Sequence, residues 1–486
     1  MGERDKGNDF IFYFSVIEDR ESMEIGKITI DGMDVVAIEE IRLDAAINCH
    51  AALQLVCLID QAQMKHYVML PERDNIITVR AEDKVIFCGT AVEAICRTKK
   101  GSTYLYLTLW NGSYLLDREK KSKSYQDTTM TYQELAQDKA VTVYAGEDKA
   151  LGSIVVQYQE TDWDFLVRMA SRLSTGVYAD MRQPKCVLYW GIGTGNTAEH
   201  TQIAEYTVEK DLDFYRGCVE NASAKPTMEQ CVTYEFECGE ILAVGDAVLL
   251  DGKQVYITEV HCRMEQADLR GCYKARAKEG ICYLPRYRFD MPGTALEGTV
   301  IDVAKDKVKV HLRIDEMQDK ENAYWFPFSA MEASADGSGW YYMPELGDCV
   351  KVCIPEWDET DAFAVSAVSS YEGKDGATDM MADTNTMYMR NPSGKQMQMT
   401  PEQIKADGGD NKSFFEMDAE GNMILCADQS VSMLAMETME IEARDVVEVK
   451  ASKLLNLKTA MTGEILMNEA GELQHLGGHV NINREE

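Results

Sequence analysis

An eight-residue repeat near the C-terminus limits the fold of this chain more than any other feature of its sequence. Apolar residues fill the first and third places of each block and alanine usually the fifth, as in Met423-Ile-Leu425-Cys-Ala427. Other blocks begin at Phe415, Val431, Met439, Val447 and Leu455, and two with glycine in first place begin at Gly463 and Gly471. Residues two apart share a face on a strand but not on a helix. Each block therefore predicts a short strand and a turn, which is typical of a β-helix.

A single chain of such strands would leave its apolar face in water. Three copies wound about one axis would bury that face and leave no free lateral strand edges. The residues expected on the outside are Glu440, Glu442, Glu448 and Lys450. A coiled-coil stalk is the alternative, but it needs a heptad repeat, which the sequence lacks. Residues 391–486 are therefore predicted to form an intertwined trimeric β-helix.

The first part of the chain, residues 1–290, consists mostly of short strand patterns with turn signals. They predict two β-barrels with short helices inserted. Thr131-Tyr-Gln-Glu134 is a capping-box sequence that predicts the start of one helix. A second helix is predicted from Asp162, with Gly176 placed to stop it. Its apolar stripe consists of Leu166, Met169, Ala170 and Leu173.

Five further strand patterns lie within residues 291–371, which suits a small closed barrel of the OB type. They cover 296–303, 307–312, 324–328, 349–354 and 363–368. A polar stretch rich in glycine and aspartate, residues 372–390, is predicted to link this barrel to the tail. The predicted fold class is therefore mainly β.

Composition excludes several classes of protein. The net charge of −33 argues against a nucleic-acid partner, which requires clustered lysine and arginine. No stretch approaches the roughly 18 apolar residues that a membrane helix needs. The polar N-terminus lacks the pattern of a signal peptide, so we expect synthesis in the cytoplasm. The fourteen cysteines contain no CxxC pair and are interpreted as reduced core residues.

Several segments, in the right order, resemble VgrG proteins and phage late-control tail proteins, the hub and spike subunits of contractile injection systems. Residues 159–173 resemble the helix segment of that family, residues 298–301 and 344–352 its OB barrel, and residues 391–399 the strand that enters its β-helix. The resemblance covers nearly the whole chain. At residues 355–361 the chain departs from the usual Gly-Asp-Pro turn, which leaves the subgroup of injection system open.

The resemblance implies a mechanical part rather than an enzyme. A homotrimer would cap the tail tube, contact baseplate proteins and puncture the target cell envelope, with transient membrane contact. A PAAR-like tip protein or an effector cargo is a possible partner at the C-terminal end. The chain would be assembled into a tail-like particle and delivered to the target envelope or outside the cell. The alternatives are a trimeric surface adhesin or lectin and a glycan-cleaving enzyme on a β scaffold.

No catalytic, cofactor-binding or metal site is predicted. The sequence has no GxSxG, HExxH or P-loop motif, and Gly191-Ile-Gly-Thr-Gly195 is interpreted as a loop. Asp162 and Asp164 are interpreted as carboxylates at a helix N-terminus rather than as an acid–base pair. His475 and His479 are the best metal candidates, since octad register turns both inward. An axial stack or a contact with a tip protein is the alternative for these histidines.

Overall fold

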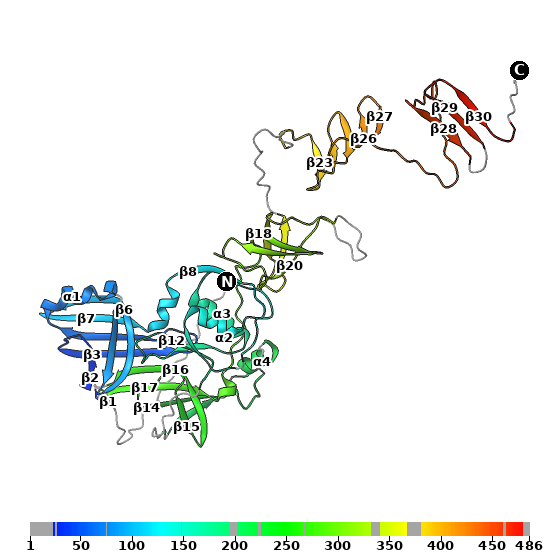
Figure 1. The fold of residues 1–486 in the computed structure, drawn as a ribbon. Helices are drawn as coiled ribbons and strands as arrows, with labels where there is room; N and C mark the ends of the chain where they lie inside the picture. Colours follow the sequence, from blue (N-terminus) through cyan, green and yellow to red (C-terminus); the bar gives the residue numbers. More distant parts are fainter. Residues whose placement is uncertain are drawn as a thin grey trace, which may run out of the picture. The chain divides into compact units, whose positions relative to one another are not determined.

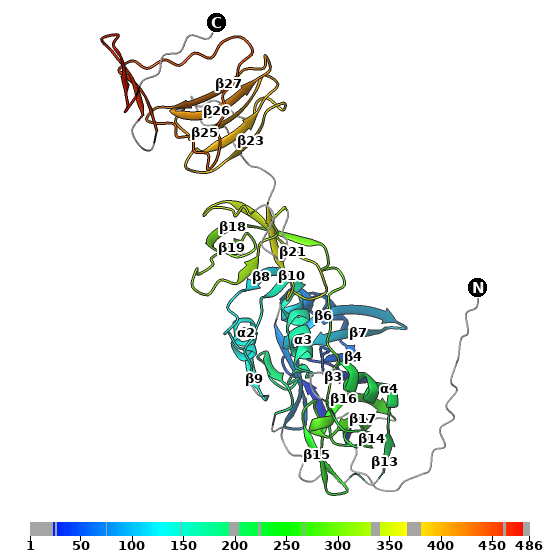
Figure 2. The ribbon, with the colours of Figure 1, turned by 90° about the vertical axis from the view of Figure 1, so that its right-hand side faces the viewer.

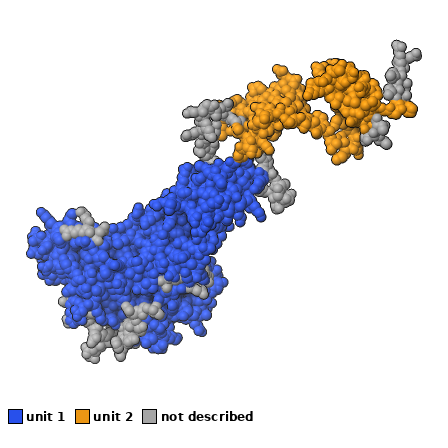
Figure 3. All heavy atoms as spheres, in the orientation of Figure 1, with its two compact units in different colours: residues 1–370 blue, residues 371–486 orange. Residues whose placement is uncertain are grey.

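The computed structural model describes residues 23–24, 27–73, 75–146, 148–193, 203, 205–221, 225–265, 268–331, 341–366, 381–459 and 463–479. Strands dominate the regular structure, so the mainly β prediction is confirmed (Figure 1). The chain divides into two compact units, residues 1–370 and 371–486 (Figure 3).

The first unit contains a twelve-stranded sheet (Figures 1 and 2). Its strands are β1 (Met23–Glu24), β2 (Ile28–Ile30), β3 (Ala37–Ala46), β4 (Ala52–Ile59), β5 (Ile76–Ala81), β6 (Lys84–Lys99), β7 (Ser102–Trp110), β13 (Tyr206–Glu209), β14 (Thr233–Cys238), β15 (Ala247–Leu250), β16 (Lys253–Glu265) and β17 (Asp268–Arg276). The path runs β13-β14-β17-β16-β3-β4-β7-β6-β5-β2, with β1 paired to β17 and β15 to β16.

The sequence predicts two barrels for the first part of the chain. In the structure, the strands of the two predicted barrels belong to one continuous sheet. Antiparallel pairing of β16 with β3 places Val260 opposite Ala45. Alternation along β7 buries Leu105, Leu107 and Leu109, because successive side chains of a strand point to opposite faces. The two halves share one apolar core, which includes Leu107 and Val260.

Helices and short strands cover the rest of the hub, the name used here for residues 1–290. The helices are α1 (Met64–Val68), α2 (Tyr132–Lys139), α3 (Asp162–Arg172) and α4 (Leu212–Asn221), with 3₁₀ turns η2 (Gln61–Gln63), η3 (Leu70–Arg73), η4 (Gly112–Asp117) and η5 (Lys278–Gly280). The strands are β8 (Lys120–Tyr125), which pairs with β10 (Val155–Thr161), and β9 (Val141–Tyr144), β11 (Val177–Ala179) and β12 (Val187–Trp190), ordered β11-β12-β9. No helix among the described residues is long and apolar enough to span a membrane.

Both predicted helices are present. Thr131 caps α2 in a complete capping box with Glu134. The C-terminal stop of α3 differs from the prediction, because Ser174, with φ 57°, takes the left-handed position just beyond the helix. Gly176 serves packing instead, since a Cβ there would lie 2.3 Å from Cγ2 of Ile47.

The predicted OB fold is confirmed between residues 294 and 366. It contains β18 (Thr294–Ala304), β19 (Lys307–Leu312), β20 (Trp325–Pro327), β21 (Cys349–Ile354) and β22 (Phe363–Ser366), ordered β20-β19-β18-β21-β22. A parallel bridge between Phe328 and Ala364 brings the two ends of the sheet together. The barrel interior includes Val310, Phe326 and Val352.

The second unit contains two antiparallel sheets (Figure 2). The first is ordered β23 (Met387–Arg390), β24 (Gln396–Met399), β25 (Gln403–Asp407), β26 (Ser413–Asp418) and β27 (Met423–Ala427), and the second β28 (Leu454–Lys458), β29 (Glu464–Asn468) and β30 (Leu473–Leu476). Octads beginning at 415, 423, 455, 463 and 471 thus contain strands near their predicted places. The three octads beginning at 431, 439 and 447 contain no strand in the single chain, contrary to the sequence expectation.

Candidate functional site

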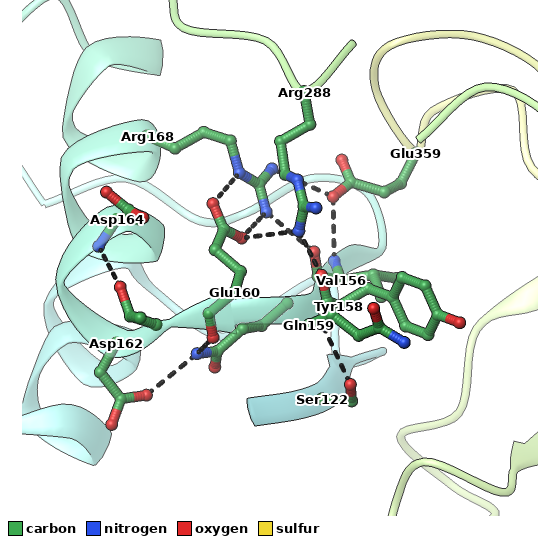
Figure 4. Close-up of polar contacts among 12 residues, drawn as sticks. Ser122, Val156, Tyr158, Gln159, Glu160, Asp162, Asp164, Arg168, Arg288 and Glu359 are labelled. Carbon is green, nitrogen blue, oxygen red and sulfur yellow. Dashed lines mark hydrogen bonds and ion pairs between the residues drawn. The ribbon is translucent and has the colours of Figure 1, made fainter. Parts of the chain in front are cut away.

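A buried cluster of charges joins α3 to the OB barrel (Figure 4). Arg168 donates to the Glu160 carboxylate from Nε at 3.0 Å and from Nη2 at 2.8 Å. On its other side, Nη1 of Arg168 donates to Oε1 of Glu359 at 3.2 Å. Glu359 also accepts from the backbone N of Val156 at 3.1 Å and from Nη2 of Arg172 at 2.5 Å. One OB-loop carboxylate therefore links a hub helix and a hub strand.

This cluster is held by charge pairing in a nearly dry environment. The Glu359 side chain is 1% exposed and that of Arg168 is 4% exposed. Burial alone would raise the pKa of Glu359, but the positive charges of Arg172 and Arg168 outweigh it and hold the pKa below its usual value. Removing either partner of such a pair leaves an uncompensated buried charge. The cluster therefore fixes the orientation of the loop that carries Glu359.

Glu359 belongs to residues 355–361, the segment that departs from the family pattern. Sequence reasoning missed its role, because 191 positions separate it from Arg168. The sequence offered one indication, which is that an acidic segment replaces the expected Gly-Asp-Pro turn at residues 355–361.

The two aspartates at the start of α3 lie in different environments. Asp162 and Asp164 both lie in the first turn of the helix, as predicted. Asp162 is buried and pairs with Nζ of Lys121 at 2.5 Å and Nζ of Lys139 at 3.1 Å. Its carboxylate therefore forms two ion pairs in addition to its place at the helix N-terminus. Asp164 is exposed. The two carboxylates therefore have different surroundings and separate structural roles.

The glycine-rich segment after β12 is a loop, as predicted, over residues 191–193. Gly191 has φ 79° and donates its backbone N–H to the Gly176 carbonyl at 2.9 Å. Thr194 and Gly195 lie outside the described residues.

A Ser–His–Asp arrangement that the sequence did not suggest lies in the hub. Nδ1 of His50 is 2.8 Å from Oγ of Ser113, and Nε2 is 3.3 Å from Oδ2 of Asp117. Ser113 is fully buried, however, and its hydroxyl donates to Oδ1 of Asn111 at 2.8 Å. The His50 ring packs 4.5 Å from that of Trp163. A nucleophile needs access to its substrate and a free hydroxyl proton for its base, so this geometry supports packing rather than acyl transfer.

Many apolar side chains of the tail, residues 381–479, are exposed, and none of its described residues is buried. The four buried apolar clusters all lie between Ile28 and Ala364. In the octads, Ile441 is 72% exposed and Val449 64% exposed. Other exposed residues at first and third places are Met423, Leu425, Val431, Met433, Met439, Val447 and Leu457. Contiguous exposed apolar side chains of this kind are typical of protein or membrane interaction sites.

The two histidines singled out from the sequence lie near the end of the described tail. His475 belongs to β30, and both His475 and His479 border a shallow hollow together with Ile465. Within one chain, the described residues contain no group of three or more His, Cys, Asp or Glu side chains placed to hold a metal ion. Ion binding between copies and an axial stack both remain predictions.

Comparison with known proteins assigns the fold. Residues 296–368 match the family model of the type VI secretion system/phage-baseplate injector OB domain. The chain is also similar to the E. coli c3393 protein, described as a component of the type VI secretion system with structural similarity to the T4 phage tail proteins gp27 and gp5. That match has 14% sequence identity and a TM-score of 0.50, and it covers 70% of this chain and 99% of the other. The chain shares the fold of the c3393 protein.

Other similar structures come from secretion systems and phage tails. The chain is 9% identical to the half-lidded Francisella PdpA-VgrG complex, with a TM-score of 0.49 and coverage of 80% of this chain and 83% of the other. It is 12% identical to a tail protein of Neisseria meningitidis MC58, with a TM-score of 0.36 and coverage of 52% and 96%. No curated protein sequence matches it. The resemblance drawn from the sequence is confirmed by the OB-domain match and the c3393 fold.

Proposed function

We propose that this VgrG-like chain is the hub-and-spike subunit of a contractile, phage-tail-like injection system. Residues 1–290 would form a trimeric hub that caps the tail tube, and residues 291–371 the OB barrel below it. Residues 372–390 would link the barrel to a puncturing spike formed by residues 391–486. The observation that carries this proposal is the tail, which exposes an octad apolar stripe and has no buried residue among those described.

Trimerisation supplies the burial that the single tail lacks. Fully burying one Val, Ile, Leu or Met side chain contributes about 1.5–3 kcal/mol. Octads without glycine in first place offer two large apolar side chains per chain, as with Met439 and Ile441 or Val447 and Val449. A closed three-fold arrangement would also leave no lateral strand edge. The product would be a stiff, narrow rod that concentrates the force of sheath contraction.

The proposed partners follow from this role. Two further copies, the tail tube and baseplate proteins would contact the chain permanently, and the target membrane transiently. A PAAR-like tip protein or an effector cargo would attach near His475 and His479. The chain would act mechanically rather than as an enzyme, after assembly into a tail-like particle in the cytoplasm.

Native mass spectrometry of the full chain tests this function, combined with co-expression with the tail tube protein of the same system. We expect three chains per particle and a stable complex with the tube protein. A trimer that does not bind the tube protein but binds glycans would favour an adhesin instead. A monomer would contradict the proposal.

A further inference from the structure

Four methionines lie on one face of the first two tail strands. β23 contains Met387 and Met389, and β24 contains Met397 and Met399. Their antiparallel pairing places Met387 opposite Met399 and Met389 opposite Met397. Residues two apart on a strand share a face, and so do directly opposite residues of paired strands. These four side chains, here called the Met quartet, therefore form a compact group on one face of a two-stranded ribbon.

The neighbouring strands continue this face with apolar side chains. Strands β23 to β27 form one sheet (Figure 2). In it, Ile404 lies opposite Met399 and Ala406 opposite Met397. The next two strands add Phe415, Met417, Met423 and Leu425 to the same face. Across these five strands, all of which the structure describes, the register places no His, Cys, Asp or Glu on this face. The only metal-binding groups that it offers are therefore thioethers.

The Met quartet is accessible within one chain. Its side chains are exposed, from 37% at Met399 to 65% at Met387. Packing alone does not explain the choice of residue, because β-branched and aromatic residues are the ones favoured in strands. What methionine adds is a soft, polarisable sulfur atom at the end of a flexible stem with three rotatable bonds.

The geometry allows the four sulfur atoms to meet at one point. Directly opposite residues of an antiparallel pair have Cβ atoms about 4.5–5.5 Å apart, and diagonal neighbours are about 7–8 Å apart. A methionine stem is long enough to span half of either distance. Soft thioether ligands select Cu(I), whereas Mg²⁺, Ca²⁺ and Mn²⁺ prefer the oxygen ligands that this face lacks.

We propose that the Met quartet binds a single Cu(I) ion per chain through its thioether sulfurs. Each sulfur would donate a lone pair to the ion, with no electron transferred and no proton released. The bound ion would hold β23 to β24 at the start of the tail. One chain supplies all four ligands, so the inference goes beyond the proposed function and does not rest on it.

Competing thiols define the background for the test. Cu(I) also binds thiolates. The exposed cysteines are Cys49, Cys349 and Cys426, and the register places Cys426 on the opposite face of the sheet. The parent for every measurement is therefore the full chain with these three cysteines replaced by serine. Cu(I) is added without oxygen and measured in competition with a chromophoric Cu(I) chelator.

Two quadruple variants of this parent test the site. Leucine is close to methionine in volume, so both variants should fold, which circular dichroism checks. The quartet variant is Met387→Leu, Met389→Leu, Met397→Leu and Met399→Leu. The control variant replaces four exposed methionines outside the sheet, Met317→Leu, Met331→Leu, Met433→Leu and Met436→Leu. We expect the parent and the control variant to bind a single Cu(I) per chain, and the quartet variant to bind it at least about 100-fold more weakly. Equal affinities of the two variants would overturn the inference.

The pH dependence of binding identifies the ligands independently. Thiolate and imidazole must lose a proton before they bind a metal, whereas a thioether has none to lose. The affinity of the parent should therefore change by less than about threefold between about pH 5.5 and about pH 7.5. An affinity that falls about tenfold or more on acidification would contradict thioether ligation. Native mass spectrometry of the same samples reports the number of chains separately, so a trimer without Cu(I) would overturn this inference and leave the proposed function standing.

Discussion

Replacing Glu359 by alanine should uncouple the OB barrel from the hub at a large cost in stability. The change removes a carboxylate that is 1% exposed and accepts hydrogen bonds from Arg168, Arg172 and the backbone of Val156. It leaves the buried Arg168 with one carboxylate partner, Glu160, and a hydrogen bond to the carbonyl oxygen of Val156. Breaking a buried ion pair from one side costs about 3–5 kcal/mol. We therefore expect Glu359→Ala to lower the free energy of unfolding by about that amount.

Urea unfolding followed by tryptophan fluorescence measures this cost. Glu356→Ala is the matched control, since Glu356 is exposed in the same loop and should change the free energy by less than about 0.5 kcal/mol. The folded-state pKa of Glu359 lies below its ordinary 4.5. Its contribution is therefore complete above pH 4.5 and is lost as the pH falls through the lowered pKa. Equal costs for Glu359→Ala and Glu356→Ala at pH 7 would refute the assignment of this cluster.

Two further predictions concern the hub. Burial lowers the pKa of His50 below 6.5 although Asp117 opposes the shift, so the unfolded state takes up its proton first and stability should fall as the pH drops below 6.5. As the pH is lowered, the melting temperature of His50→Gln should fall less steeply than that of the unmodified chain. Equal slopes for the two proteins would contradict the prediction. Gly245→Ala should lower the free energy of unfolding by at least about 1 kcal/mol, because φ is 89° and the new Cβ would lie 2.1 Å from the Tyr178 hydroxyl. Gly252→Ala is the control for backbone strain alone, because Gly252 has φ 73° and a Cβ there would meet no atom within 4 Å. Equal urea midpoints for Gly245→Ala and Gly252→Ala would refute the packing argument.

Features specified by neighbouring residues were predictable from the sequence. The capping box at Thr131 and the strand alternation of residues 349–354 depend on contacts only a few positions apart, and both are present. The octad starting at Met423 forms a strand with the predicted bounds, Met423–Ala427. Local periodicity was sufficient in each case.

Features that depend on distant residues were not predictable. The pairing of β16 with β3 joins the two halves of the hub, and no periodicity within either strand indicates its partner. The pairing of Glu359 with Arg168 also spans 191 positions. In the tail, the period correctly indicated the apolar stripe but not which octads fold back on their own chain. No single turn motif decides this: β26 turns into β27 at Gly421, three residues after Asp418, whereas β24 turns into β25 through residues 400–403, which contain no glycine.

The central claim is that the octad stripe faces two other copies of the chain. Native mass spectrometry of two triple variants tests it most directly. The inward set is Met433→Asp, Ile441→Asp and Val449→Asp, and the outward set, one position later in each octad, is Leu434→Asp, Glu442→Asp and Lys450→Asp. An inward carboxylate would cost several kcal/mol because it is desolvated at the axis. We expect the unmodified chain and the outward set to form trimers and the inward set to be monomeric. A monomeric unmodified chain, or an inward set that stays as trimeric as the outward set, would contradict the account.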